Sequence, residues 1–250
     1  MDIAGFQKNS FIDYPGKIAA VIFCGGCNYN CWYCHNRHIL LGDYPAVNEK
    51  EVFAYLEKRR GMVDAVVFSG GEATLQKDLG EYMKRVKGMG YLVKLDTNGA
   101  KPEALDKLIR DGLVDYVAMD IKAPFDRYKE VTGVAADVGA VKKSIDLLMN
   151  WEEKSKKVKA DKANEKTKNL FDYEFRTTCV PQFKPADIES IAEEIAGARL
   201  YAMQQYRHTG TENKVTPISL PPHEKSFFIE AKALAEKYVG NVVIKGIQVT

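Results

Sequence analysis

The chain has 250 residues, which is enough to bury a substantial core as one domain. Hydrophobic residues make up 46% of it and charged residues 28%, values near the averages for soluble globular proteins that exclude a disordered or fibrous chain. The net charge of +2 is too small to indicate nucleic acid or a membrane surface as a partner.

The hydrophobic pattern predicts repeated βα units. Short β-branched and apolar runs alternate with longer amphipathic segments, as is typical of a parallel sheet whose strands are linked by helices. Strands are expected at residues 18–24, 64–68, 91–96, 116–120, 173–180, 200–206 and 241–247. Helices are expected at residues 49–59, 77–88, 102–111, 138–151, 187–197 and 222–238. Six or seven strands favour an α/β fold with an open, partial barrel over a closed barrel of eight strands.

One lysine-rich stretch departs from this rhythm. Residues 152–169 carry seven lysines and almost no large apolar side chain. We expect a solvated excursion from the single domain at 1–250, as a helix extension or a loop, rather than a docking patch for an acidic partner. No apolar run approaches the roughly 18 residues of a membrane-spanning helix, and the amino terminus lacks a signal-peptide pattern, so we expect a cytoplasmic protein.

Cysteines are concentrated early in the chain. Four of the five lie within eleven residues, which indicates a metal site rather than a disulfide framework. Cys27, Cys31 and Cys34 have the spacing C-x3-C-x2-C after the first predicted strand. A 4Fe–4S cluster held by three cysteines leaves one iron free for an external ligand. The alternative is a structural zinc site that recruits His35 or His38 as its fourth ligand, in a zinc-binding interaction module.

The same spacing, with an aromatic residue before the last cysteine, resembles the signature of the radical S-adenosylmethionine (radical SAM) superfamily. The resemblance implies a partial (β/α)6-type barrel and an oxidoreductase. It also implies that Cys27, Cys31 and Cys34 bind three irons of a 4Fe–4S cluster. The amino and carboxylate groups of S-adenosylmethionine would bind the fourth iron, and Tyr33 would pack near the adenine.

Polar motifs follow the next predicted strands, at the end where parallel α/β barrels place their chemistry. After residues 64–68 come Gly70, Gly71 and Glu72, in which the glycines allow close backbone approach and the carboxylate can accept an amine. This stretch resembles the superfamily's GGE motif. The resemblance implies that it binds the cofactor and that Glu72 holds the methionine amino group.

Two further strand ends resemble those of glycyl-radical activating enzymes. Asp96 and Thr97 end the predicted strand 91–96, and Met119, Asp120 and Lys122 end the strand 116–120. The resemblance implies that the first four of these residues surround a monovalent cation beside the methionine carboxylate, and that Lys122 contacts the cofactor. By itself, an aspartate at this position can also cap a following helix.

Two later residues complete the expected cofactor site. Arg176 lies on the predicted strand 173–180, where an inward arginine needs a carboxylate partner. That partner can be the cofactor carboxylate or an internal salt bridge. His208 follows the strand 200–206, where the resemblance implies a residue against the ribose or adenine.

The amino-terminal stretch 5–17 and the sequence after Cys34 resemble those of activating enzymes for glycyl radical proteins. They look most like the activating proteins of anaerobic ribonucleoside-triphosphate reductase, in their longer, pyruvate formate-lyase activase-like form. The resemblance implies reductive cleavage of S-adenosylmethionine and abstraction of a glycine Cα hydrogen from a partner glycyl radical enzyme. In pyruvate formate-lyase activase the corresponding motif is Asp-Gly-Pro-Gly, which implies that Asp13 meets the partner's glycine loop, although Tyr14 here replaces the first glycine of that motif.

No second cysteine-rich segment follows, so we expect electrons from an external flavodoxin or ferredoxin. Two alternatives within radical SAM enzymes stay open. One is an activase of pyruvate formate-lyase or another glycyl radical enzyme, and the other is a small-molecule enzyme such as 7-carboxy-7-deazaguanine synthase.

Overall fold

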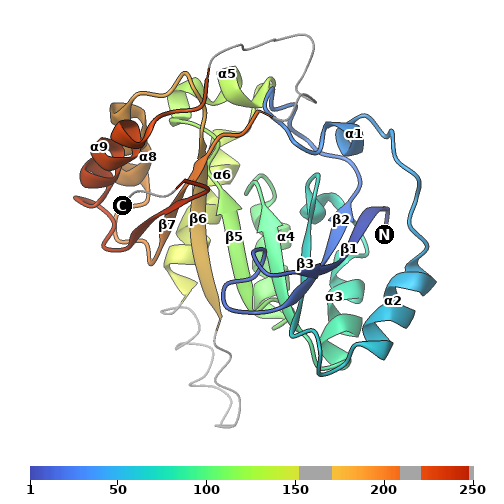
Figure 1. The fold of residues 1–250 in the computed structure, drawn as a ribbon. Helices are drawn as coiled ribbons and strands as arrows, with labels where there is room; N and C mark the ends of the chain where they lie inside the picture. The colour runs from blue at the N-terminus through green and yellow to red at the C-terminus, as the bar shows by residue number, and fades with distance from the viewer. Residues whose placement is uncertain (152–170, 209–220, 248–250) are drawn as a thin grey trace, which may run out of the picture.

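The computed structural model describes residues 1–151, 171–208 and 221–247 (Figure 1). The lysine-rich stretch predicted at 152–169 lies outside these ranges. The strands are β1 (Ile3–Ser10), β2 (Ala19–Cys24), β3 (Ala65–Gly70), β4 (Leu92–Thr97), β5 (Tyr116–Asp120), β6 (Asp172–Cys179), β7 (Tyr201–Gln205) and β8 (Val242–Lys245). The helices are α1 (Arg37–Leu40), α2 (Glu49–Lys58), α3 (Leu79–Gly88), α4 (Pro102–Arg110), α5 (Tyr128–Thr132), α6 (Val138–Met149), α8 (Pro185–Glu194) and α9 (Lys225–Ala235).

All eight strands form one sheet in the order β1 to β8, and the sheet does not close. Strands β2 to β8 are parallel, each paired with its neighbour in the chain, which confirms the seven predicted strands and the open α/β barrel. Each helix that links two strands returns the chain to the next position in the sheet. The carboxyl ends of seven strands therefore lie along one edge.

Strand β1 was not predicted. It pairs antiparallel to β2, and its register shifts twice, between Ile3 and Gly5 and between Gln7 and Ser10. These irregularities interrupt the alternation of apolar and polar residues by which a half-buried strand is recognised in a sequence. The lead-in segment therefore adds an edge strand instead of a loop.

The outer face of the sheet carries the main apolar core. Alternate strand residues such as Ile22, Phe68 and Leu95 are fully buried there against the helices, which surround the curled sheet in Figure 1. Helix α4 illustrates the packing, because its buried Leu105 and Ile109 are one turn apart on one face. This layer fixes the positions of the strands.

The inner face changes character along the sheet. On β2 and β3 it is apolar, and Tyr14 packs there against Tyr116 of β5 with ring centroids 5.6 Å apart. Across β4 to β8 it carries charged and polar side chains instead. The charged side chains are Lys94, Asp96, Asp120, Glu174, Arg176 and Lys245. None of the helices that the structure describes covers this face, so its side chains border the interior of the open barrel (Figure 1).

Several predicted helix ends shift by a few residues. The helix expected at 77–88 begins at Leu79, and the helix expected at 222–238 spans Lys225–Ala235. Such shifts are ordinary, because capping residues and frayed last turns leave helix ends weakly specified. In the part of the chain that the structure describes, the helices are too short or too polar to cross a membrane.

Candidate active site

Three cysteines face one cavity at the carboxyl ends of the parallel strands. Cys27, Cys31 and Cys34 lie on the loop after β2, and all three line a cavity of about 290 Å³, which we call the thiol cavity. Cys31 is 8% exposed, and the other two are half-buried. Three thiols therefore border one space.

The cysteine loop is held by hydrogen bonds to segments far along the chain. The backbone N–H of Asn30 donates to the carbonyl of Thr132 at 2.8 Å. The side-chain amide of Asn98, just after β4, donates to Asn28 Oδ1 at 2.8 Å. Such supporting contacts hold a binding loop in position before any ligand arrives.

Burial changes the chemistry of the thiols. It raises the pKa of the Cys31 thiol to about 12 and also raises the pKa of Cys27. In both cases the charge of Lys122 opposes the rise. Iron binds thiolates, so loading a cluster here releases protons, and a nearby lysine stabilises the negative charge that results.

The donor chemistry of this loop fits an iron–sulfur cluster. In residues 1–151, 171–208 and 221–247, no group of three or more His, Cys, Asp or Glu side chains lies close enough to hold one metal ion. A structural zinc ion needs all its ligands about 2.0–2.3 Å from a single ion. A 4Fe–4S cluster binds each cysteine to a different iron, so its thiols do not have to meet at one point. His35, the alternative zinc ligand, has its Nε2 3.2 Å from the carbonyl oxygen of Arg207.

Glycine is required at two positions where β3 meets the cysteine loop. Gly70 has a φ of +107°, and a Cβ there would overlap the backbone of Cys24. A Cβ at Gly71 would overlap the carbonyl of Gly26. The backbone N–H groups of Gly71 and Glu72 donate to the carbonyls of Cys24 and Gly26, each at 2.9 Å. The two glycines thus bring the β3 end into direct contact with the loop that carries the cysteines.

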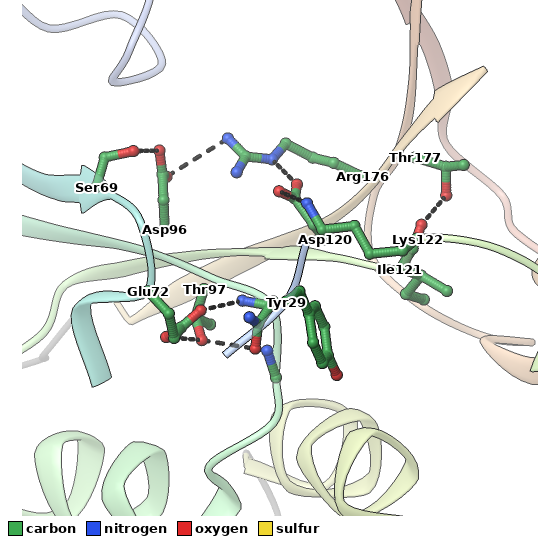
Figure 2. A network of polar contacts seen from close by, with 12 residues as sticks. Tyr29, Ser69, Glu72, Asp96, Thr97, Asp120, Ile121, Lys122, Arg176 and Thr177 are labelled. Carbon is green, nitrogen blue, oxygen red and sulfur yellow. Dashed lines mark hydrogen bonds and ion pairs between the residues drawn. The ribbon is translucent and has the colours of Figure 1, made fainter. Parts of the chain in front are cut away.

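Glu72 is a buried carboxylate surrounded by donors, as Figure 2 shows in part. It is 1% exposed, and its Oε1 accepts from the hydroxyls of Thr74 and Thr97 at 2.5 and 2.8 Å. Its Oε2 accepts from the backbone N–H of Asn98 at 2.7 Å. Burial raises the pKa of Glu72, and these hydrogen bonds oppose the rise. Oε2 keeps a lone pair for a further donor such as an amine.

Figure 2 shows Arg176 lying between two carboxylates from neighbouring strands. Its Nε donates to Asp120 at 2.7 Å, and its Nη1 lies 3.4 Å from Asp96. Lys122 Nζ is 2.9 Å from the other oxygen of Asp120, and Lys94 pairs with Asp96. One continuous ion-pair network therefore joins β4, the end of β5 and β6, and it consists of Lys94, Asp96, Asp120, Lys122 and Arg176.

The network sets the charge state of its members. Burial by itself would raise the pKa of Asp120, but the charges of Arg176 and Lys122 hold that pKa well below its usual range. Burial would likewise raise the pKa of Asp96, and Arg176 and Lys94 lower it. Burial lowers the pKa of Lys94, and Asp96 partly offsets this. Both carboxylates are thus held ionised by cations of the same chain.

The thiol cavity brings together most of the residues predicted for the cofactor. Its lining includes the predicted residues Cys27, Cys31, Tyr33, Cys34, Gly70, Gly71, Glu72, Asp96, Thr97, Asp120, Lys122 and Arg176. These residues come from the loop after β2 and from the ends of β3, β4, β5 and β6. The internal salt bridge considered for Arg176 is present, and its guanidinium also borders the cavity.

Three predicted residues lie elsewhere. Met119 is fully buried, with its terminal methyl against Gly99. Asp13 lines a second cavity of about 540 Å³, together with residues of the loop before β2 and of strands β4, β6, β7 and β8. His208 is exposed and is not among the residues that line the thiol cavity. Its contact with the nucleoside stays a prediction.

The sequence interpretation missed Lys94 and the glutamines of β7. Gln204 and Gln205 line both cavities. The Oε1 atom of Gln205 is buried and has no hydrogen-bond partner among the described residues, so it can accept from a ligand hydroxyl. Lys94 could have been noticed as a lysine inside an apolar strand, two residues before Asp96 and so on the same face.

Sequence comparison agrees with this geometry. The profile of the Radical SAM superfamily matches residues 21–150, a stretch that contains the three cysteines and Glu72. The chain belongs to the Radical SAM superfamily and is a radical SAM enzyme.

Similarity to a relative extends over the whole length of this chain. The chain is 37% identical over 250 residues to a protein of Methanocaldococcus jannaschii named as a glycyl-radical enzyme activating enzyme. The match covers 99% of this chain and 97% of that protein, so the two belong to one family. That family implies a 4Fe–4S cluster and S-adenosylmethionine as cofactors.

Two solved structures share the fold. A domain of a pyruvate-formate lyase-activating enzyme from Bacteroides vulgatus matches with a TM-score of 0.52 and 17% identity, covering 73% of this chain and 99% of that one. Streptococcus suis SuiB bound to its precursor peptide SuiA matches with a TM-score of 0.58 and 15% identity, covering 92% of this chain and 49% of that one. At these identities the likeness shows the fold alone.

Proposed function

We propose that this chain activates a glycyl radical enzyme by removing one hydrogen atom from a glycine Cα of that partner. The observation that carries the proposal is the thiol cavity, whose lining holds Cys27, Cys31 and Cys34 together with a buried carboxylate and two half-buried cations. The full-length similarity to a protein named as an activating enzyme supports the choice of partner class.

The residues of the thiol cavity divide between the cluster and S-adenosylmethionine. The three cysteines hold the 4Fe–4S cluster. Glu72 accepts the methionine amino group at its Oε2, and Lys122 and Arg176 face the methionine carboxylate. With both cofactors bound, one electron from an external flavodoxin or ferredoxin and one hydrogen atom from the glycine would convert S-adenosylmethionine into methionine and 5′-deoxyadenosine.

The nucleoside end needs an apolar surface and hydrogen-bond acceptors. Tyr33 is 6% exposed and lies against Trp32 with ring centroids 5.5 Å apart, so its position is fixed by packing. We place the adenine against Tyr33 and Gly71, and a ribose hydroxyl at the unpartnered Oε1 of Gln205. Because Gln205 lines both cavities, this placement would bring the ribose to the boundary between them.

We assign the second cavity to the glycine loop of the partner. It shares Arg176, Gln204 and Gln205 with the thiol cavity, so a peptide in it would reach the nucleoside. At its wall, Asp13 accepts from the hydroxyl of Ser10 at 2.5 Å, which shapes the loop before β2. The backbone N–H groups of an extended peptide can donate hydrogen bonds to a carboxylate such as that of Asp13.

Exposed apolar side chains adjoin this cavity. On the same loop, Phe11 is 74% exposed and Ile12 is 89% exposed, and Ile12 also lines the second cavity. Large apolar side chains held in water at the entrance of a polar cavity are typical of a protein docking surface. The partner that we favour is anaerobic ribonucleoside-triphosphate reductase, because the lead-in sequence 5–17 resembles that of its activating proteins.

An anaerobic activation assay tests the proposal. The reconstituted enzyme, S-adenosylmethionine and a chemical reductant are mixed with anaerobic ribonucleoside-triphosphate reductase, pyruvate formate-lyase or no partner. We expect a glycyl radical signal by electron paramagnetic resonance only with a cognate partner, and 5′-deoxyadenosine in equal amount. Cleavage of S-adenosylmethionine without a radical on any glycyl radical enzyme would overturn the partner assignment while leaving the cofactor assignment in place.

A further inference from the structure

The resemblance implies a monovalent cation among Asp96, Thr97, Met119 and Asp120, and the contacts of these residues do not fit one. Asp96 Oδ1 accepts from Lys94 and lies 3.4 Å from Arg176, and its Oδ2 accepts from the hydroxyl of Ser69 at 2.9 Å. Both oxygens of this carboxylate are therefore already bound by donors of the chain.

Asp120 and Thr97 are engaged in the same way. The two oxygens of Asp120 accept from Arg176 at 2.7 Å and from Lys122 at 2.9 Å. The hydroxyl of Thr97 donates to Glu72 and accepts from the N–H of Gly99 at 3.1 Å. A cation at this place would lie beside ammonium and guanidinium groups that already contact both carboxylates.

The charge balance points the same way. Three cations, Lys94, Lys122 and Arg176, contact two carboxylates, which leaves a formal surplus of one positive charge. The nearby Glu174 is paired with Lys245 at 2.7 Å and does not consume this surplus. One positive charge is the complement of one ligand carboxylate, and a further cation would meet repulsion from Arg176 and Lys94.

Lys94 is a fixed part of the fold rather than an exchangeable charge. Its side chain is 2% exposed, and it extends from β4 on the same face as Asp96. A lysine is almost never buried to this degree unless it is paired. Lys94 also lines the second cavity, next to the ion-pair network. Its ammonium contacts Oδ1 of Asp96, whereas the hydroxyl of Ser69 contacts Oδ2.

We propose that Lys94 and Arg176 take the place of the monovalent cation, so that this chain binds S-adenosylmethionine without one. Lys94 is then a positioning residue, which holds Asp96 and through it the guanidinium that faces the cofactor carboxylate. The inference rests on the cofactor assignment made above and is independent of the identity of the partner protein.

The first test uses the unmodified protein. The dissociation constant of S-adenosylmethionine is measured anaerobically on the cluster-loaded enzyme, in potassium buffer and in tetramethylammonium buffer of equal ionic strength. We expect the two values to agree within about two-fold, since the charge at Asp96 is built in. Thallium(I), a potassium analogue, should give no anomalous diffraction peak at Asp96 and Asp120 in crystals soaked with it.

The second test removes the built-in charge. In Lys94→Met, S-adenosylmethionine should bind about ten-fold more weakly in tetramethylammonium, and potassium should restore part of the affinity because it can now occupy the position of the ammonium. Lys87→Met is the matched control. In the unmodified protein Lys87 pairs with Asp115 at 2.6 Å, before the start of β5 and away from the thiol cavity. The affinity of the Lys87→Met variant for S-adenosylmethionine should therefore not respond to potassium.

Two results would overturn the inference. If the unmodified enzyme loses affinity by ten-fold or more without potassium, or shows a thallium peak between the two aspartates, a cation site exists. If it binds S-adenosylmethionine in neither buffer, the cofactor assignment fails and the inference fails with it. The first outcome leaves the proposed function intact, so the two failures can be told apart.

Discussion

The two cavities inside the open barrel share Arg176, Gln204 and Gln205, yet they offer different chemistry. The thiol cavity is bordered by three cysteines and by Glu72, whose hydrogen bonds are supplied from neighbouring loops. The described residues that line the second cavity include no cysteine, and the exposed loop before β2 borders it. One inner surface is thus divided into a part suited to cofactors and a part suited to a peptide.

The division follows from the strands. The carboxyl ends of β2 and β3 bring the cysteine loop and the glycine turn together, whereas the second cavity lies over the charged face of β4, β6 and β8. The ion pairs of Lys94 and Arg176 lie between the two parts. If each cavity has its own task, changes in one should leave the task of the other intact.

The largest effect is expected from Cys31→Ala. Removing one of three thiols should abolish the cluster, its brown colour and all cleavage of S-adenosylmethionine, because the remaining two ligands cannot hold the cube. Iron content and ultraviolet-visible spectra of anaerobic protein measure this. Partner binding should survive, since the second cavity is untouched. Cys179→Ala, a buried cysteine on β6, is the control and should keep its iron; equal iron loss in both would contradict the assignment.

Glu72→Gln should weaken S-adenosylmethionine binding by about 3 kcal/mol, or roughly 100-fold, because a buried charged acceptor for the amino group is lost. Titration of the cluster-loaded protein gives the affinity. Since burial raises the pKa of Glu72, the affinity of the unmodified protein should also fall on acidification, starting above the ordinary carboxyl value of 4.5. Glu81→Gln on the exposed face of α3 should change neither quantity.

Arg176→Met should lower the free energy of unfolding by about 2 kcal/mol at neutral pH. The loss is smaller than for a buried carboxylate left without any partner, because Lys94 and Lys122 still contact Asp96 and Asp120. The pKa of Asp120 is depressed in the fold, so its stabilising contribution is present above the unfolded value near 3.8 and is lost below it. The difference in the free energy of unfolding between Arg176→Met and the unmodified protein should therefore shrink in acid. Urea unfolding at several pH values measures this difference. The control is Arg60→Met, which removes one partner of an exposed ion pair. A stability difference for Arg176→Met that grows in acid would refute the explanation.

The smallest effect is expected at the docking loop. Replacing Phe11 and Ile12 together by alanine should weaken partner binding by about ten-fold, because two exposed apolar contacts are lost. Cleavage of S-adenosylmethionine without partner should be unchanged. Ile229→Ala, which removes an exposed apolar side chain from α9, is the control and should bind the partner normally. A loss of cofactor cleavage in the loop variant would break the division between the cavities.

Much of the cofactor site could be predicted from the sequence because its signals are local. The cysteine spacing spans eight residues, and the glycine turn and the strand-end aspartates each occupy a few consecutive positions. The seven parallel strands were also predicted, since a buried strand between amphipathic helices is recognised from its own residues. The contact of His208 with the nucleoside stays a prediction, because His208 follows the end of β7 and is not among the residues that line the thiol cavity.

The sequence by itself determined the α/β architecture, the three cysteines and the carboxylate after the glycine turn, because each depends on side chains close together in the chain. Only the tertiary structure decided that Arg176 reaches Asp96 across eighty positions, that Lys94 neutralises the same carboxylate, and that the lead-in forms β1. These features depend on strand register and on the charges that meet when separate strands align. Such long-range pairings have no signal in any one segment of the chain.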